Sequence, residues 1–166
     1  MAFVPEDGTG LPDANSFVDV AYADDYFATL GNAAWTGDDT LKQGWLVQAT
    51  SYICTVFRSR LGCYTPLSED QALPFPSEEN GMPKALLTAT CEYAVRAKSG
   101  PLAPDPLVDA SGFAVVTTRK KVGPIEKEFS IAGSSSQAQL YRSYPLPDAM
   151  MQSILCPGGG DTRVIR

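Results

Sequence analysis

The side chains that most often carry out chemistry in proteins are scarce in this sequence. Its 166 residues include no histidine, so the usual general base at neutral pH and the commonest metal ligand are missing. Catalysis by a Ser-His-Asp or Cys-His group is therefore excluded. Four cysteines remain as soft metal ligands, and no two of them have the CxxC spacing of common zinc sites. We expect no catalytic residue, no metal and no cofactor.

The cysteines are expected to be reduced. Cys54 and Cys91 fall within apolar helical patterns, where cysteine behaves as a small hydrophobic residue. Cys63 is expected to be the most exposed, but no neighbouring base or charge pattern marks it as a nucleophile. Residues 1–16 are acidic and rich in Gly and Pro, without the apolar run of a signal peptide. The simplest prediction is four free thiols, Cys156 included, in a cytoplasmic protein; a disulfide framework is the alternative.

Two acidic pairs and a glycine run could form ligand sites. Asp24-Asp25 and Asp38-Asp39 have the carboxylates that metal binding or acid–base catalysis uses. Solvated helix faces and N-cap positions explain these pairs equally well and are favoured. The Gly158–Thr162 segment has the glycines of a phosphate-binding loop but lacks its Gly-Lys-Ser/Thr ending. It is therefore interpreted as a flexible hinge.

Only one run of basic residues is present. Arg119-Lys120-Lys121 could contact DNA, but it precedes Glu126 and Glu128 in a segment with strand-like alternation, which favours cross-strand ion pairs. The net charge of the chain is −6, and residues 1–41 contain acidic residues but no Lys or Arg. This balance argues against tight binding to nucleic-acid phosphates, because such binding needs clustered basic side chains.

Three helices are predicted before residue 100. Val20–Leu30 has a plausible N-cap at Asp19 and a terminating glycine at Gly31. Residues 83–98 begin at a proline, a favoured first helical residue. Residues 40–58 carry an apolar stripe expected to face the core, formed by Leu41, Trp45, Ala49, Tyr52, Ile53 and Val56. Trp45 and Tyr52 are accordingly interpreted as core anchors rather than as platforms for base stacking.

The composition changes after Pro101. A proline-rich linker leads to two predicted strands, residues 113–121 and 125–131, which would form a β-hairpin. A short helix at residues 147–155 precedes the C-terminal tail. The predicted fold is mainly α: a small bundle of three to four helices in residues 1–100, then a β-hairpin and an extended C-terminal arm in residues 101–166. No stretch is long and apolar enough to cross a membrane.

Several segments, in their order along the chain, resemble a family of tailed-phage proteins. They are EDGTGLPDANSFVDVAYADDYFATLGNAAW (6–35), LVQATSYICTVF (46–57), LPFP (73–76), MPKALLTATCEYA (82–94), KKVGPIEKEF (120–129) and RVIR (163–166). The family more often has Trp-Pro-Arg where this chain has Phe75-Pro76-Ser77. Its members are often described as DnaT-like single-stranded-DNA-binding proteins, and they look like head-tail connector adaptors.

The resemblance implies a structural role in the virion. Adaptors of this kind form rings beneath the portal, and their C-terminal arm docks on it. We therefore expect a homo-oligomer, a 12-mer ring, with the portal protein and a tail-side neck or tail protein as partners. Double-stranded DNA would pass through the ring without sequence-specific binding. The expected location is the head-tail neck of the virion, after synthesis in the host cytoplasm.

The same resemblance suggests contact residues. Arg163 and Arg166 in the tail are expected to contact the portal. Four residues of the hairpin are expected to pair neighbouring subunits: Arg119, Lys121, Glu126 and Glu128.

The function expected from these observations is a head-to-tail connector and not an enzyme. The alternative is a DnaT-like single-stranded-DNA-binding replication accessory protein, which would need a basic groove with exposed aromatic side chains. An enzyme with an acidic site ranks third, because no recognisable catalytic constellation is present.

Overall fold

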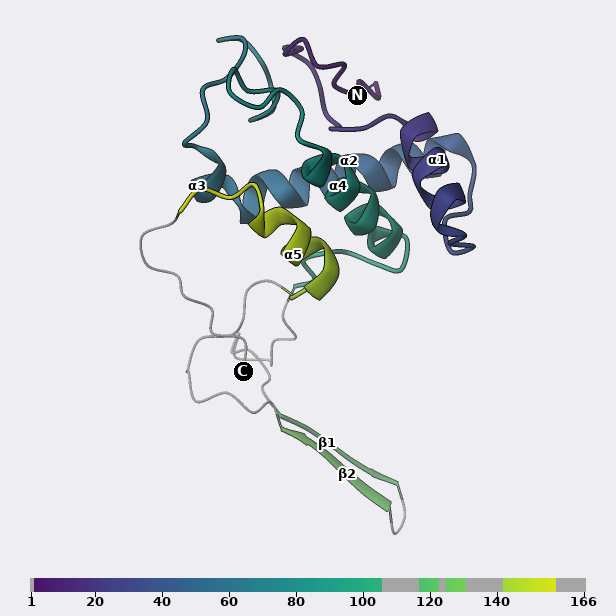
Figure 1. Cartoon of the computed structure of the whole chain (residues 1–166). Helices are drawn as coiled ribbons and strands as arrows, with labels where there is room; N and C mark the ends of the chain where they lie inside the picture. Colours follow the sequence, from purple (N-terminus) through teal and green to yellow (C-terminus); the bar gives the residue numbers. More distant parts are fainter. Residues whose placement is uncertain (1, 106–116, 123–124, 131–141, 158–166) are drawn as a thin grey trace. The chain divides into compact units, whose positions relative to one another are not determined.

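The computed structural model describes residues 2–105, 117–122, 125–130 and 142–157 (Figure 1). The chain divides into two units. A helical unit runs to Leu102 and resumes at Ser143, and a smaller unit comprises Ala103–Arg142. The predicted division placed everything after residue 100 in a hairpin and arm, whereas the chain returns to the helical unit after the insertion.

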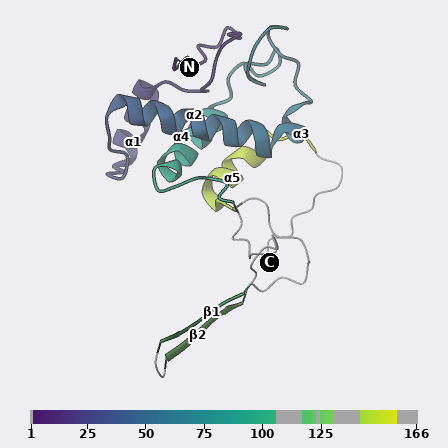
Figure 2. The same cartoon turned by 180° about the vertical axis from the view of Figure 1, so that it is seen from behind.

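The described part of the helical unit contains five helices, which confirms the prediction of a mainly helical fold. They are α1 (Val20–Leu30), α2 (Asp39–Val56), α3 (Arg58–Leu61), α4 (Lys84–Ala97) and α5 (Pro145–Gln152). α4 packs against α2 on one side and against α5 on the other, and α1 contacts both α2 and α4 (Figures 1 and 2). The core therefore centres on α4, whose largest buried side chain is Tyr93.

Capping residues fix where the first two helices begin. The carboxylate of Asp19 accepts a hydrogen bond from the backbone N–H of Tyr22, and that of Asp38 accepts one from Leu41. Both satisfy N–H groups that have no partner inside the helix. Gly31 ends α1 with a φ of 63°, a left-handed conformation that glycine adopts without a steric penalty. The predicted bounds of α1 are confirmed.

The buried face of α2 differs from the predicted stripe. Ala49, Tyr52 and Ile53 are buried as expected, but Leu41 is 51% exposed and Leu46 is fully buried instead. Leu41 lies in the first turn of α2. Periodicity located the centre of the helix correctly and failed at its end, where neighbouring helices decide burial.

The last helix is anchored by aromatic side chains. The ring of Tyr144 packs edge-on against those of Tyr52 and Tyr93. The Tyr93 hydroxyl donates to the carboxylate of Asp148 on α5, and the Tyr144 hydroxyl donates to the carbonyl of Leu102, 2.9 Å away. This last hydrogen bond joins the two ends of the insertion. The predicted C-terminal arm is thus in part a core element.

The segment before α1 folds back on itself and contacts the chain near Ala72. The backbone N–H of Glu6 donates to the carbonyl of Ser16 at 2.8 Å, which turns the segment back on itself. The Glu6 carboxylate is buried and accepts backbone N–H groups from Gly8, Gly10 and Leu11. The backbone carbonyl of Leu11 then accepts from Ala72, at 3.0 Å. This contact brings residues near position 14 beside the 71–74 segment.

The insertion contains two strands, β1 (Thr117–Val122) and β2 (Ile125–Ser130). They pair antiparallel, with Lys120 opposite Lys127. The neighbouring register pairs are Arg119 with Glu128 and Lys121 with Glu126.

Candidate nucleic-acid interface

A basic corner forms where α2 breaks into α3. α2 ends at Val56, and Phe57 has φ −104° and ψ 6°, so the chain leaves the α2 axis before α3 starts. Phe57 and Leu61 are buried, whereas Arg58 and Ser59 are exposed. Residues four apart lie on one face of a helix, so the two apolar side chains anchor the turn and leave the intervening polar ones facing outward.

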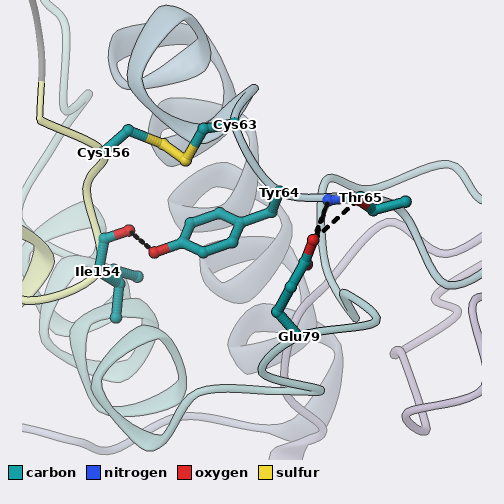
Figure 3. The surroundings of a disulfide bond; sticks show 6 residues. All are labelled: Cys63, Tyr64, Thr65, Glu79, Ile154 and Cys156. Atoms are coloured by element: carbon teal, nitrogen blue, oxygen red, sulfur yellow. Dashed lines mark hydrogen bonds between the residues drawn. A yellow bond between two sulfur atoms is a disulfide. The ribbon is translucent and has the colours of Figure 1, made fainter.

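A disulfide and three hydrogen bonds hold this corner. Figure 3 shows the disulfide and the hydrogen bond between Tyr64 and Ile154. Cys63, just after α3, is bonded to Cys156, just after α5, with their Cα atoms 6.2 Å apart. The backbone N–H of Cys156 donates to the carbonyl of Arg60 at 3.0 Å, and the Tyr64 hydroxyl donates to the carbonyl of Ile154 at 2.8 Å. The Arg60 guanidinium reaches the side-chain oxygen of Gln152, 3.3 Å away.

The disulfide corrects the prediction of four free thiols. Only Cys54 and Cys91 are free. Cys63 and Cys156 are 93 positions apart, with no local motif to signal their pairing. They meet because α5 packs back on α4 and brings the residues that follow it beside the end of α3. The exposure expected for Cys63 is confirmed.

Two adjoining cavities lie along α2 and α3, and we call them together the groove. The first, the arginine cavity, has a volume of about 800 Å³ and the second, the aliphatic cavity, about 600 Å³. Arg58 and Gly62 line both. The arginine cavity is lined by Thr55, Arg58, Ser59, Arg60, Gly62, Cys63, Cys156 and Pro157.

Among the described residues, the groove carries positive charge without a compensating carboxylate. The described lining of the two cavities includes no Asp or Glu, and Arg58 and Arg60 are its only charged residues. Within the described ranges, no carboxylate pairs with the Arg58 guanidinium. The Nε atom of Arg60 is buried and has no hydrogen-bond partner there. A buried unpaired donor costs about 1–3 kcal/mol, and because this atom is buried, an anion reaches its hydrogen only when the Arg60 side chain moves.

The remaining thiols are not poised as nucleophiles. Burial raises the pKa of Cys54 to about 12, although the charge of Arg58 acts in the opposite direction. Burial, with a smaller contribution from the charge of Glu92, also raises the pKa of Cys91 to about 12. Both cysteines therefore stay protonated at neutral pH, and the thiol is a poor nucleophile.

One member of each acidic pair has a structural role. Asp38 caps α2, and Asp24 accepts a hydrogen bond from the indole N–H of Trp35 at 2.6 Å and pairs with Lys42 at 2.8 Å. Burial opposes the ionisation of Asp24, but the hydrogen bonds from Lys42 and Trp35 outweigh it and lower its pKa. In the parts of the chain that the structure describes, no three His, Cys, Asp or Glu side chains gather as a metal site would require.

A second group of cations and aromatic rings lies at the N-terminal end of α2, and we call it the tryptophan corner. Trp35 packs against Phe27 and Trp45, with ring centroids 5.0 and 5.7 Å apart. The Lys98 ammonium lies 5.6 Å from the Trp45 ring. The same ammonium donates to the carbonyls of Ala34 and Thr36 and to the Thr36 hydroxyl. Lys98 therefore ties the 34–36 loop to the end of α4.

The other residues singled out in the sequence have separate positions. Arg119, Lys121, Glu126 and Glu128 lie in the strands of the insertion, and a role for them in subunit pairing stays a prediction. Arg163, Arg166 and the Gly158–Thr162 segment lie outside the described residues. Among the described helices, none is long and apolar enough to cross a membrane.

Sequence reasoning missed the groove. Arg58 and Arg60 are separated by one residue at the end of a predicted helix, and neither forms a basic run. The overall acidic charge also hid them. A signal was present in the spacing of Phe57 and Leu61, which marks a buried face opposite Arg58, but nothing in the sequence indicated the cavity walls.

Comparisons with known proteins give one family. A family model described as "Putative DnaT-like ssDNA binding protein" matches residues 1–166 of the chain. No curated protein and no solved structure matches it. The family match contradicts the predicted function of a head-tail connector and agrees with the alternative, a single-stranded-DNA-binding protein. Three further predictions stay untested: the ring, the portal and tail partners, and the virion location. They were made from the connector function, which the family match contradicts.

Proposed function

The chain belongs to the family of DnaT-like single-stranded-DNA-binding proteins, and on that basis we propose that it binds single-stranded DNA through the groove. The observation that carries the proposal is the arginine cavity. It gathers two guanidinium groups, and no carboxylate is among its described lining residues, in a chain with a net charge of −6. A positively charged cavity in a negatively charged chain indicates an anionic ligand.

The geometry suits a phosphodiester backbone. Guanidinium groups bind phosphate oxygens through two parallel hydrogen bonds, and such charge-assisted bonds are about twice as strong as neutral ones. Arg58 is exposed and free of carboxylates within the described residues, so it can reorient toward a phosphate. Arg60 is partly fixed by Gln152 and keeps an unused Nε hydrogen. In this proposal one arginine captures the strand and the other positions it.

The hairpin of the insertion supplies a second contact in this proposal. The register places Lys120 opposite Lys127, and Phe129 follows two positions later in β2. Residues two apart in a strand share a face, so two basic positions and an aromatic one belong to the same face of the pair. Basic and aromatic residues together are typical of surfaces that bind single strands. The opposite face holds the register pairs Arg119–Glu128 and Lys121–Glu126.

We also propose that the protein acts by binding and not by catalysis. The absence of histidine from the sequence and the protonated state of Cys54 and Cys91 support this proposal. Sustained turnover of an oligonucleotide by the purified chain would contradict it.

Fluorescence anisotropy with a labelled oligonucleotide tests the function. Arg58→Ala is expected to weaken binding about tenfold, because a charge-assisted hydrogen bond contributes about 1.5–3 kcal/mol. The dependence of log K on log salt concentration should also become shallower by about 0.7, the value for one phosphate contact on a single strand. Lys84→Ala is the matched control, because Lys84 is exposed on α4 and lines neither cavity.

The control should leave both affinity and salt dependence unchanged. If the unchanged protein shows no binding at low salt, the proposed function is wrong. If Arg58→Ala and Lys84→Ala have equal effects, DNA binding lies elsewhere in the chain and the groove is not the site.

A further inference from the structure

The aliphatic cavity differs in chemistry from the arginine cavity that it adjoins. Its walls come from three separate parts of the helical unit: the segment before α1, α2 with α3, and residues 71–74. Most of the wall is apolar, with Val47, Leu61, Leu73 and Pro74 among its residues. Its volume of about 600 Å³ is within the usual range for a small-molecule site, about 300–1,000 Å³.

The side-chain amides and the buried hydroxyl group of this wall already form hydrogen bonds within the protein. The side-chain oxygen of Asn15 accepts from the backbone N–H of Val4, and its amide donates to the carbonyl of Ala2. Gln71 accepts from Ser68 through its side-chain oxygen and donates through its amide to two backbone carbonyls. The Thr50 hydroxyl accepts from the backbone N–H of Phe17, at 3.1 Å. These groups hold the segment before α1 and the 71–74 segment in place.

These hydrogen bonds leave the cavity suited to an apolar face and poorly suited to recognition of polar edges. A site distinguishes one base from another through hydrogen bonds to base edges, and it needs free donors or acceptors to do so. Here the amides are used within the protein. The described residues of the wall include no aromatic ring for stacking, so a base would be held by aliphatic contacts.

Arg58 joins the two cavities because it lines both. A phosphate bound by Arg58 would have its own nucleoside close to the mouth of the aliphatic cavity. In a duplex that base is stacked and paired, and it must leave the helix to enter a protein pocket, which costs a few kilocalories per mole. In a single strand that cost is smallest.

We propose that the aliphatic cavity binds one unstacked nucleobase of any identity from the strand whose phosphate lies on Arg58. The inference rests on the proposed function, and it gives a physical reason why the protein would prefer single-stranded to double-stranded DNA. Phosphate contact alone occurs with single and double strands, whereas occupation of the cavity needs a base that is free to turn out of its stack.

The test compares a labelled thymidine oligonucleotide with an abasic strand of the same length, which keeps the phosphates and lacks the bases. The unchanged protein should bind the thymidine strand about tenfold more tightly, because only that strand can bury a base. Oligonucleotides of adenosine, cytidine and thymidine should bind with affinities that differ by no more than about threefold, since the cavity reads no base edge.

A variant that fills the cavity isolates its contribution. Ser51 is exposed on α2 and lines the aliphatic cavity, so Ser51→Leu is expected to reduce its free volume without disturbing the core. This variant should bind the thymidine strand as weakly as the abasic strand and should keep its affinity for the abasic strand. Gln48→Leu is the matched control, because Gln48 is exposed on the same helix and lines neither cavity.

A measurement without substitution locates the base. Cys54 lines the aliphatic cavity, and its thiol can be labelled with N-ethylmaleimide. The labelling needs long reaction times, because the pKa of about 12 keeps the fraction of thiolate small. The thymidine strand should slow the labelling of Cys54, as measured by mass spectrometry, and the abasic strand should not.

The outcomes separate the inference from the function on which it rests. Equal affinity for the two strands, together with weaker binding of both by Arg58→Ala, would overturn the nucleobase site and leave phosphate binding in the groove intact. Failure to bind either strand would overturn the proposed function and the inference together. A preference of more than about threefold for one base would contradict the indifference to base identity.

Discussion

Cationic side chains lie at both ends of α2, but in opposite circumstances. At the N-terminal end, the tryptophan corner combines aromatic rings with Lys42 and Lys98, which is the composition usually associated with binding of single strands. Lys42 is paired with Asp24, however, and Lys98 donates to three oxygens of the 34–36 loop. At the C-terminal end, Arg58 keeps its donors free of carboxylates within the described residues.

The comparison shows that residue type is a weaker guide to function than the hydrogen bonds already made. The lysines at the tryptophan corner stabilise a loop and a helix end, so a ligand would have to break these contacts before it could bind. Arg58 in the groove offers donors without such a cost. The predictions below change one end of α2 and measure stability and DNA binding together.

The largest effect is expected at the tryptophan corner. Trp35→Ala should lower the free energy of unfolding by about 3–5 kcal/mol, because it removes a buried ring and the hydrogen bond to Asp24. Urea unfolding followed by circular dichroism measures this change. DNA affinity should stay the same under conditions in which the variant is folded; a loss of binding there would make the corner part of the interface.

The matched control at this end is Leu41→Ala. Leu41 is also apolar and close to the corner, but it is 51% exposed. Its replacement should change stability by less than about 0.5 kcal/mol, as surface substitutions usually do.

The next largest effect is expected from the disulfide at the other end. Replacement of both Cys63 and Cys156 by serine should lower the free energy of unfolding by about 2–4 kcal/mol, because the bond closes a long loop in the unfolded chain. A dithiol reductant should destabilise the unchanged protein by a similar amount and leave the double variant unaffected. If reduction has no effect on urea unfolding, the two cysteines are not paired in solution.

Arg60 should separate binding from stability. Arg60→Met keeps most of the aliphatic stem and removes the guanidinium, whose Nε is buried without a partner among the described residues. DNA affinity should fall about tenfold, whereas the free energy of unfolding should change by less than about 1 kcal/mol. A large loss of stability with unchanged binding would reverse the comparison and make Arg60 a structural residue.

The smallest effect concerns the charge of Asp24. Its folded-state pKa is lowered, so its ionised form contributes stability above the unfolded-state pKa, near 3.8, and this contribution is lost as the pH falls through the folded-state value. Asp24→Asn should therefore lower stability at pH 7 by less than about 1 kcal/mol, because the pair with Lys42 is partly exposed.

Urea unfolding between pH 7 and pH 2 measures this contribution. The difference between the unchanged protein and Asp24→Asn should shrink as the carboxylate is protonated. A difference that is constant over that range would show that the charge of Asp24 does not stabilise the fold.

Local signals in the sequence were sufficient to locate α1, α2 and α4. The N-cap at Asp19, the glycine at Gly31 and the apolar spacing of α2 and α4 act within one or two turns of the backbone, so they can be recognised without knowledge of the fold. The same is true of the absence of histidine, which excludes whole classes of catalysis whatever the fold.

The groove and the disulfide beside it could be recognised only in the tertiary structure. Arg58 comes from the break after α2, the aliphatic wall from segments near positions 14 and 72, and Cys156 from the chain that follows α5. These segments are brought together by contacts between residues far apart in sequence, among them the hydrogen bonds Ala72–Leu11 and Tyr144–Leu102. Which cations remain unpaired also depends on such contacts, so whole-chain charge and local runs of basic residues could not reveal the site.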